Sequence, residues 1–277
     1  MPSQHSLIDP GLGAKAVTVR INPADIDYIA SGFDAAYFME KAYGLHPDGW
    51  QQDLLQRSPT KMLLLCSRQS GKSTVCAAMA LHKAIFTAGS LVLIISNAFR
   101  QAEETFRKVK AGLGYVKQAA GLVHETQTML ELGNGSRIVS LPGKQESIRS
   151  FSSVSLMIID EAAQVPDDLY RSVRPMLAVS RGTLVALTTP FGKRGWFYNS
   201  WVNGEGWHKV QITADACPRI SKAFLADEMT EIGEWWVKQE YYCEFVDAED
   251  QVFSHDLLMA AITSDIRALT VGDAFKL

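Results

Sequence analysis

The chain has 277 residues, of which 47% are hydrophobic and 21% charged, a composition ordinary for a folded protein of one large domain with an appendage. Its net charge of −3 excludes a global basic field, so any contact with nucleic acid has to be local. No apolar run approaches the ~20 residues that cross a bilayer, and the N-terminus lacks a signal-peptide pattern, which favours a cytoplasmic protein without membrane contact. The cysteines, without paired C-x-x-C spacing, indicate reduced core thiols: Cys66, Cys76, Cys217 and Cys243.

The first 45 residues predict an arm and a helix that pack on the core of the protein. Residues 1–20 show only a weak pattern, which is typical of a flexible lead-in. Pro23 then opens an amphipathic pattern that predicts one helix to about Tyr43. A turn and a short helix over residues 45–52 follow.

The stretch 66–74, Cys-Ser-Arg-Gln-Ser-Gly-Lys-Ser-Thr, is typical of a phosphate-binding turn between a strand and a helix. The apolar run 62–65 before it predicts a buried strand, and the run 75–80 after it predicts a helix. Successive N–H groups at the start of such a helix point at phosphate oxygens, and the helix dipole favours negative charge there. The sequence therefore predicts a nucleotide site.

Each residue of this turn has an expected task. Gly71 allows the tight turn, Lys72 reaches the β- and γ-phosphates, and Ser73 offers its hydroxyl to Mg²⁺. Cys66 stands where the usual pattern has its first glycine, so an ordinary helix start after a core strand is the alternative for this motif taken alone. The remaining nucleotide-binding candidates in the turn are Gln69, Ser70 and Thr74.

The next elements predict a mainly parallel sheet. Residues 91–95 are a second buried strand, and a helix over about 98–113 follows. Residues 128–132 and 137–141 flank Gly-Asn-Gly-Ser, and an Asn-Gly pair accepts the positive φ of a type I′ turn. The sequence therefore predicts an inserted antiparallel hairpin.

A second chemical motif follows at residues 156–161, where an apolar run ends in two carboxylates. This is the pattern of a central parallel strand whose carboxyl end opens onto a ligand site. We expect Asp160 to hold Mg²⁺ through water and Glu161 to polarise the water that attacks the γ-phosphate. A core strand ending in solvated acids is the alternative, but it needs a coincidence with the phosphate-binding turn. Together the two motifs indicate ATP hydrolysis.

A further strand over residues 183–187 ends in Thr188, Thr189 and a proline. Polar residues at this position can sense the γ-phosphate and relay its loss, or they can simply form a Thr-Pro turn. Spacing alone leaves both interpretations open.

The ordered set of motifs resembles the ATPase part of the large terminase subunit, the motor that packages DNA into tailed-phage heads. The resemblance runs from about residue 45 to about 256 and rests on Trp50-Gln51, the turn 67–73, the 134–136 hairpin, Ile148-Arg149-Ser150, Ile159-Asp160-Glu161-Ala162, Thr188-Thr189-Pro190-Phe191-Gly192, and the stretch from Trp236 to Phe253. It implies an α/β P-loop NTPase fold of the ASCE or RecA-like type, a mainly parallel sheet flanked by helices, with a β-hairpin insertion and a small C-terminal lid. It also implies that ATP and Mg²⁺ are the cofactors.

The resemblance assigns further roles by position. Gln51 matches the family's adenine-recognising glutamine, and Arg68 matches the arginine within the phosphate loop that touches the γ-phosphate. Arg149 lies in a segment that in related motors acts on the neighbouring subunit's ATP, although a surface arginine is an equal alternative. Thr188 and Thr189 match the coupling motif.

The resemblance also suggests a division of the chain. We expect the arm and helix over 1–45, an ATPase core over 46–206, a lid and linker over 207–256 containing three tryptophans, and a tail over 257–277. Full large terminase subunits continue into a nuclease domain with two metals, and the chain after Cys243 is too short to build one, so we expect no nuclease activity. The lid tryptophans are Trp207, Trp235 and Trp236, and the late acidic residues are Asp247, Glu249, Asp250, Asp256, Asp265 and Asp273.

The partners that the resemblance implies are double-stranded DNA, the portal protein, the small terminase subunit and further copies of the chain. Five copies would form a ring on the portal, in the cytoplasm of the bacterial host, whereas an isolated domain would be a monomer. Two other interpretations remain open. One is a helicase-like ATPase of superfamily two, which would need a second RecA-like domain, and the other is a scaffold that binds nucleotide without turnover.

Overall fold

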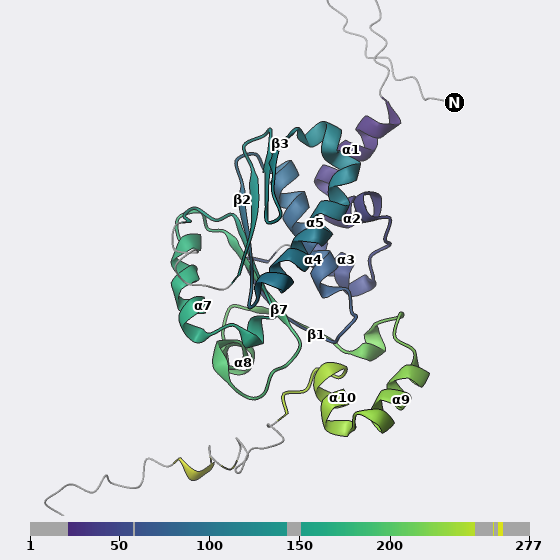
Figure 1. Cartoon of the computed structure of the whole chain (residues 1–277), viewed down its shortest axis with the longest axis vertical. Coiled ribbons are helices and arrows are strands. Elements are labelled where there is room, and N and C mark those ends of the chain that lie inside the picture. Colours follow the sequence, from purple (N-terminus) through teal and green to yellow (C-terminus); the bar gives the residue numbers. More distant parts are fainter. Residues whose placement is uncertain (1–21, 58, 143–150, 247–256, 258–259, 263–277) are drawn as a thin grey trace, which may run out of the picture.

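The computed structural model describes residues 22–57, 59–142, 151–246, 257 and 260–262. Its centre is an eight-stranded sheet in the order β3-β4-β5-β2-β6-β7-β1-β8, with helices on both faces (Figure 1). Within these ranges, no helix combines the length and the apolar character that crossing a bilayer would require.

The sheet is parallel apart from β4, which pairs antiparallel with both of its neighbours. The strands are β1 (Lys61–Cys66), β2 (Leu91–Ser96), β3 (Leu122–Glu125), β4 (Met129–Leu132), β5 (Arg137–Pro142), β6 (Leu156–Asp160), β7 (Thr183–Thr188) and β8 (His208–Ile212). Strand β7 lies between β1 and β6, so the carboxyl ends of all three meet at one edge. This edge is where ligands of open α/β sheets bind.

The two faces of the sheet bury different helices. One face carries α1 (Pro23–Phe33), α2 (Ala35–Tyr43), α3 (Gly49–Arg57), α4 (Lys72–Phe86) and α5 (Phe99–Ala120), and the other carries α7 (Asp167–Val173) and α8 (Gly195–Asn203) with the 3₁₀ helices η1 (Ala162–Gln164) and η2 (Arg174–Leu177) (Figure 1). Alternate residues of β1 supply the two cores: Leu64 faces α4 and α5, whereas Leu63 and Leu65 face α7 and α8. The continuous apolar runs of the central strands are explained by this double burial.

A small lid follows β8. It contains the 3₁₀ helix η3 (Ala214–Ala216), α9 (Lys222–Glu231) and α10 (Glu234–Glu240), and it lies below the end of β1 in Figure 1. Leu225, Val237 and Tyr241 form its own hydrophobic cluster with Ala214. The lid is therefore packed internally, by far fewer apolar residues than either core of the sheet.

The expected single helix from Pro23 to Tyr43 is wrong, because the chain forms two helices there. Asp34 is extended, with φ −131° and ψ 107°, and its carboxylate accepts hydrogen bonds from the N–H groups of Ala36 and Tyr37. An aspartate that caps the following turn ends one helix and begins another. The apolar periodicity of the sequence continues on both sides of Asp34, so it gave no sign that the helix ends there.

The hairpin is present, but it is not a separate insertion, since β5 pairs in parallel with β2 inside the sheet. The expected type I′ turn is also wrong, because Gly135 has a positive φ of 79° and Asn134 does not. The Asn134 amide instead donates to the carbonyl oxygens of Ala84 and Ile85 at the end of α4. The contact of Asn134 with the end of α4 therefore accompanies a turn of another type than the one expected.

The boundary expected at residue 207 is displaced. Residues 208–212 form β8 and pair in parallel with β1, so they belong to the sheet. Trp207 packs against the core beside α7 and α8 and not in the lid. The helix expected over 98–113 extends to Ala120.

Candidate active site

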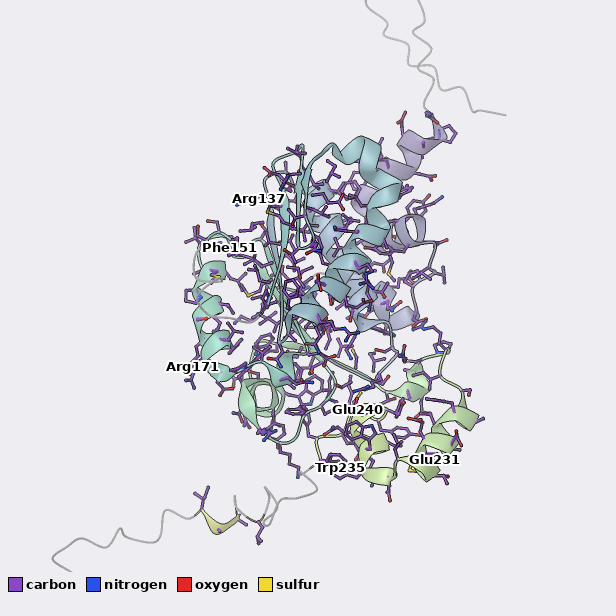
Figure 2. All side chains as sticks on the ribbon, in the orientation of Figure 1. Arg137, Phe151, Arg171, Glu231, Trp235 and Glu240 are labelled. Carbon is purple, nitrogen blue, oxygen red and sulfur yellow. The ribbon has the colours of Figure 1, made fainter. Side chains whose placement is uncertain are left out.

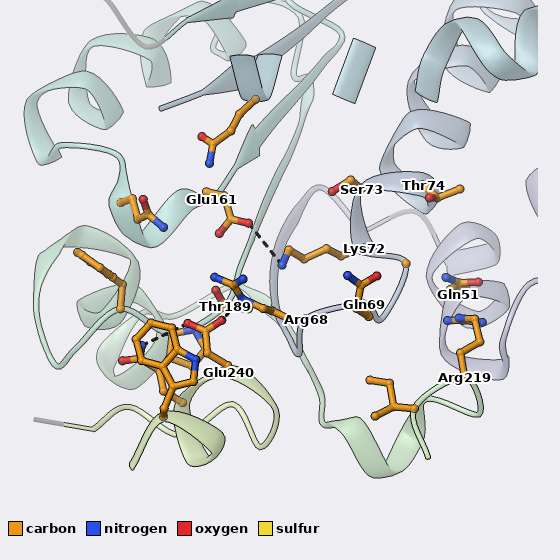
Figure 3. A pocket seen from close by; sticks show the side chains of 18 of the residues that line it. Gln51, Arg68, Gln69, Lys72, Ser73, Thr74, Glu161, Thr189, Arg219 and Glu240 are labelled. Atoms are coloured by element: carbon orange, nitrogen blue, oxygen red, sulfur yellow. Dashed lines mark hydrogen bonds and ion pairs between the residues drawn. The ribbon is translucent and has the colours of Figure 1, made fainter. Parts of the chain in front are cut away.

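A cavity of about 1440 Å³ opens at the carboxyl edge of β1, β6 and β7. It lies between the phosphate-binding turn, the end of β6 and the lid (Figure 3). The predicted residues that line it are Gln51, Arg68, Gln69, Gly71, Lys72, Ser73, Thr74, Glu161 and Thr189. Most of the predicted site residues are thus brought to one cavity from four separate parts of the chain.

The phosphate-binding turn joins β1 to α4. Cys66 is the last residue of β1 and is fully buried. It does not have a positive φ, so the backbone at this position does not require the glycine of the usual pattern. Burial raises the pKa of its thiol to about 12, so the group stays protonated at neutral pH. Gln69 and Gly71 both have a positive φ, and the Ser70 hydroxyl donates to the Ser67 carbonyl, which closes the loop on itself.

Glu161 follows the buried end of β6 in a left-handed conformation, with φ 50° and ψ 46°. Such a conformation is unusual for a residue with a side chain and is concentrated at functional sites. Its carboxylate lies 3.4 Å from the Lys72 ammonium (Figure 3). It also accepts a 3.4 Å hydrogen bond from the Thr188 hydroxyl. The phosphate-binding turn, the end of β6 and the end of β7 therefore meet at one carboxylate.

Asp160 is buried beneath this group, at the last position of β6. Thr105 of α5 donates to one carboxylate oxygen at 2.6 Å, and the Glu161 N–H donates to the other at 3.0 Å. Burial, together with the neighbouring Glu161 charge, raises the pKa of Asp160, whereas the Thr105 hydrogen bond and the Lys72 charge oppose this shift. The two hydrogen bonds thus hold the carboxylate in one orientation. Its burial makes the ionised form less stable than it would be in water.

The residues present fit a magnesium ion. The hydroxyl of Ser73, at the start of α4, and the carboxylate of Asp160 are hard oxygen ligands, which Mg²⁺ prefers. Among the described residues no group of three or more His, Cys, Asp or Glu side chains could hold a metal by itself. A protein that binds Mg²⁺ through one or two ligands plus substrate phosphates needs no such group.

Arg68 connects the phosphate-binding turn to the lid. Its Nε donates to the Glu240 carboxylate at 2.5 Å, and its backbone N–H donates to the Glu240 carbonyl (Figure 3). The Glu240 side chain is only 5% exposed, whereas that of Arg68 is 58% exposed. The arginine expected to touch a γ-phosphate is therefore paired with the last residue of α10.

Gln51 is buried, and both ends of its amide are occupied. Its Oε1 accepts from the Asp48 N–H at 3.0 Å, and its Nε2 lies 3.5 Å from the Ser70 carbonyl. Arg219, at the start of the lid, makes a bidentate pair with Asp48 and donates to the same Ser70 carbonyl at 2.9 Å. Gln51 and Arg219 thus both contact the phosphate-binding turn at the Ser70 carbonyl, while the reading of adenine by Gln51 stays a prediction.

Some predicted positions lie away from the cavity wall or outside the described residues. Ser70 and Thr188 are fully buried. The single hydrogen of the Thr188 hydroxyl is shared between the Thr189 carbonyl, at 2.6 Å, and the more distant Glu161 carboxylate, at 3.4 Å. Arg149 lies outside the described residues, as do the acidic residues from 247 onward that entered the nuclease argument. Trp235 lines the cavity and lies 5.9 Å from the half-exposed Trp236, centroid to centroid.

Sequence reasoning missed several residues at this site. Asp48 and Arg219 are 171 positions apart, and neither belongs to a recognisable motif. Gln101, Thr105 and Lys108 had a usable signal, since spacings of four and three residues put polar groups on one side of a helix that follows a strand. Gln101 and Lys108 line the cavity, and Thr105 binds Asp160.

The chain is similar to several known proteins. A family model described as "Terminase large subunit, T4likevirus-type, N-terminal" matches residues 63–259. The large terminase subunit of Thermus virus P23-45 is 26% identical over 242 residues, a match that covers 72% of this chain and 49% of the relative. The chain therefore spans about half the length of the curated relatives it matches.

Solved structures support the fold. The ATPase domain of the Thermus phage P74-26 large terminase superposes with a TM-score of 0.65 at 21% identity, covering 75% of this chain and 97% of that one. A large terminase from another thermophilic bacteriophage, solved in complex with ADP, superposes with a TM-score of 0.58 at 13% identity, covering 76% and 53%. Both share the P-loop NTPase fold. Since the family model covers more than half of its residues, the chain belongs to the family of large terminase subunits, in their N-terminal part.

Proposed function

We propose that this chain is an ATPase motor domain, which hydrolyses ATP with Mg²⁺ and thereby drives double-stranded DNA into a phage procapsid. The observation that carries the proposal is the meeting of Lys72, Glu161 and Thr188 within 3.4 Å contacts at the edge of the sheet. Hydrolysis of a phosphoanhydride requires a cation that binds phosphate and a carboxylate that orients water at the same place. A polar residue at the end of the adjacent strand can respond to the γ-phosphate.

The residues would divide the reaction between them. Lys72 would hold the β- and γ-phosphates, and Glu161 would orient and polarise the attacking water. Phosphate oxygens would share Lys72 with the Glu161 carboxylate, which brings the water-activating group next to the bond that breaks. Ser73, and Asp160 through water, would hold Mg²⁺, which would neutralise charge on the phosphates when bound.

Two arginines would stabilise the charge of the transition state. Arg68 lies in the phosphate-binding turn and can act within its own subunit if it exchanges Glu240 for the γ-phosphate. Arg149 would act on a neighbour's ATP, as the resemblance implies. An arginine of this kind contributes about 10³ to 10⁵ in rate.

The motor function extends the proposal to partners. Thr188 and Thr189 would report loss of the γ-phosphate to the rest of the fold, and the assembled form would be a ring of five copies on a portal protein. A small terminase subunit would bring the DNA, and the work would take place in the cytoplasm of the host. We also propose that this stretch of chain has no nuclease activity of its own.

Steady-state ATP hydrolysis across a wide range of protein concentration tests the proposal, with Glu161→Gln as the blank. We expect turnover that depends on Glu161 and whose specific rate rises with protein concentration, because subunits complete one another's sites. The result that contradicts hydrolysis is nucleotide binding with no turnover at any concentration, also when linear duplex DNA and portal protein are added. That result would favour the nucleotide-binding scaffold.

A further inference from the structure

Two buried polar atoms near Asp160 have no hydrogen-bond partner within the described part of the protein. They are the Ser96 hydroxyl oxygen and the Gln101 side-chain carbonyl oxygen. Buried polar groups are nearly always satisfied, and an unmade hydrogen bond costs about 1 to 3 kcal/mol. The other such atoms belong to Ser31, Tyr43 and Trp50, among the N-terminal helices. Of these atoms, those of Ser96 and Gln101 lie on the strand and helix beside Asp160.

Ser96 is the direct neighbour of Asp160 in the sheet. It ends β2 as Asp160 ends β6, and the two residues are register partners in parallel strands. Residues 92 and 94 of β2 face α4 and α5, as does Ile158 of β6, so the alternation of side chains puts Ser96 and Asp160 on that same face. Ser96 is fully buried there.

Gln101 lies near the same end of the sheet, on helix α5. Helix α5 begins directly after β2, so its first turn lies at the carboxyl edge of the sheet. Thr105, one turn later, binds Asp160, and residues four apart share a helix face. Gln101 lines the cavity together with Lys72 and Ser73. The polar residues of β2 and α5 therefore gather around the carboxylate that we assign to Mg²⁺.

We propose that Gln101 and Ser96 are positioning residues for the hydrated magnesium ion, accepting hydrogen bonds from the water molecules that the ion retains. The inference rests on the proposed function, since it presupposes a magnesium–nucleotide complex at this site. Mg²⁺ gives up its water reluctantly, and each retained water needs acceptors for its hydrogens. A carboxamide oxygen and a hydroxyl oxygen supply them, while Thr105 fixes the carboxylate that the same shell contacts.

The position of Gln101 separates this role from activation of the attacking water. Its neighbour on the helix face, Thr105, holds Asp160, whereas Glu161 interacts with Lys72 and Thr188. The effect of replacing Gln101 should therefore depend on the concentration of Mg²⁺. A purely structural role would change nucleotide binding equally with and without the metal.

The test is a Mg²⁺ titration of the binding of a fluorescent, non-hydrolysable ATP analogue to the intact chain carrying Gln101→Met. We expect half-maximal binding to need about tenfold more Mg²⁺, the usual consequence of losing an outer-shell partner, with unchanged affinity in EDTA. Gln101→Glu keeps an acceptor oxygen and should retain wild-type Mg²⁺ dependence or strengthen it. The matched control is Gln127→Met, at an exposed position outside the cavity.

Ser96→Ala gives a second, independent variant with a smaller expected shift of about threefold, because one hydroxyl contact is lost. Ser140→Ala is its control, since that buried serine of β5 donates to the Ala102 carbonyl and not toward Asp160. Mn²⁺ can replace Mg²⁺, and its binding can be monitored by electron paramagnetic resonance in the presence of the same analogue. We expect the affinity for Mn²⁺ to be lower in Gln101→Met than in the wild type.

The outcomes distinguish the two proposals. Wild-type Mg²⁺ dependence in both Gln101→Met and Ser96→Ala, with a Mg²⁺-dependent wild type, overturns this inference and leaves the ATPase proposal standing. Loss of affinity in EDTA as large as that in Mg²⁺ also overturns it, because the residues would then be structural. A wild-type protein that binds no nucleotide, or binds it regardless of Mg²⁺, overturns the proposed function and this inference with it.

Discussion

The carboxyl edge of the central strands and the lid hold the same cavity by different means. At the edge, Asp160 and Thr188 extend from strands buried on both faces, so their positions are set by two hydrophobic cores. The lid reaches the cavity through charged pairs, Arg68 with Glu240 and Arg219 with Asp48. Packing gives a rigid platform for chemistry, whereas a few ion pairs give a contact that phosphate can compete with.

This comparison predicts two kinds of variant. Changes at the edge should alter the rate of hydrolysis or the dependence of binding on Mg²⁺. They should leave the ion pairs of the lid unchanged. Changes at the lid contacts should alter nucleotide affinity, and a change that frees Arg68 from Glu240 should also alter the chemical step, because we assign Arg68 to the charge of the transition state. A lid variant that lost only kcat, or an edge variant that lost nucleotide affinity equally with and without Mg²⁺, would break the distinction.

The largest effect is expected from Glu161→Gln. The amide keeps the size of the side chain and its hydrogen bond from Thr188 but cannot accept a proton, so turnover should fall by about 10² to 10⁴. Nucleotide affinity should stay within a few-fold of wild type. Hydrolysis and equilibrium binding measured on the same preparation check this, and normal turnover would remove Glu161 from its role.

Asp160→Asn should stabilise the nucleotide-free protein while it removes the benefit of Mg²⁺. Because burial raises the pKa of Asp160 above its unfolded value, the ionised form destabilises the fold at every pH above the folded pKa. We therefore expect Tm at pH 8 to be higher in Asp160→Asn than in the wild type.

The pH dependence supplies the control for this variant. As pH falls through the raised folded pKa, wild-type Asp160 takes up its proton, so the difference in Tm between wild type and Asp160→Asn should shrink. Thermal melts from pH 8 down to the lowest pH at which the protein folds measure it. A difference that grows toward low pH would contradict a raised pKa.

Glu240→Gln should tighten nucleotide binding. Without the carboxylate, Arg68 is free to pair with the γ-phosphate, and we expect a two- to fivefold lower Kd for an ATP analogue, about what a partly exposed ion pair contributes. ADP affinity should change little. Glu231→Gln, at the outer end of α9, is the matched control (Figure 2). Equal effects on ATP and ADP analogues would exclude competition for Arg68.

The smallest effect is expected from Arg219→Lys, because a lysine cannot reproduce the bidentate pair with Asp48 and the bond to the Ser70 carbonyl. Nucleotide affinity should fall about two- to threefold with kcat unchanged. Asp48→Asn should act similarly, and the double variant should be no worse than either single one. Arg171→Lys, on the outer side of α7 away from the lid, is the control (Figure 2). Additive losses would show that the two residues act separately.

The fold class and most of the edge were predictable, because periodicity and local motifs carry the information. Two apolar runs and two polar strand ends were enough to indicate a parallel sheet with Lys72 and Glu161 at its carboxyl edge. The N-terminal helices and the start of the lid were less predictable. The break between the helices depends on one capping aspartate, Asp34, and the start of the lid depends on whether 208–212 pairs with β1. The periodicity of apolar residues predicts neither the helix break nor the pairing of 208–212 with β1.

The sequence by itself determined the fold class and indicated a nucleotide site, since a phosphate-binding turn and a strand ending in two carboxylates need only local patterns to be recognised. The tertiary structure decided which groups surround that site. Arg219 meets Asp48 across 171 positions, Glu240 meets Arg68 across 172, and Thr105 reaches Asp160 from a neighbouring helix. Contacts between segments so far apart are set by how strands order in the sheet and how helices pack on it, which no local pattern encodes.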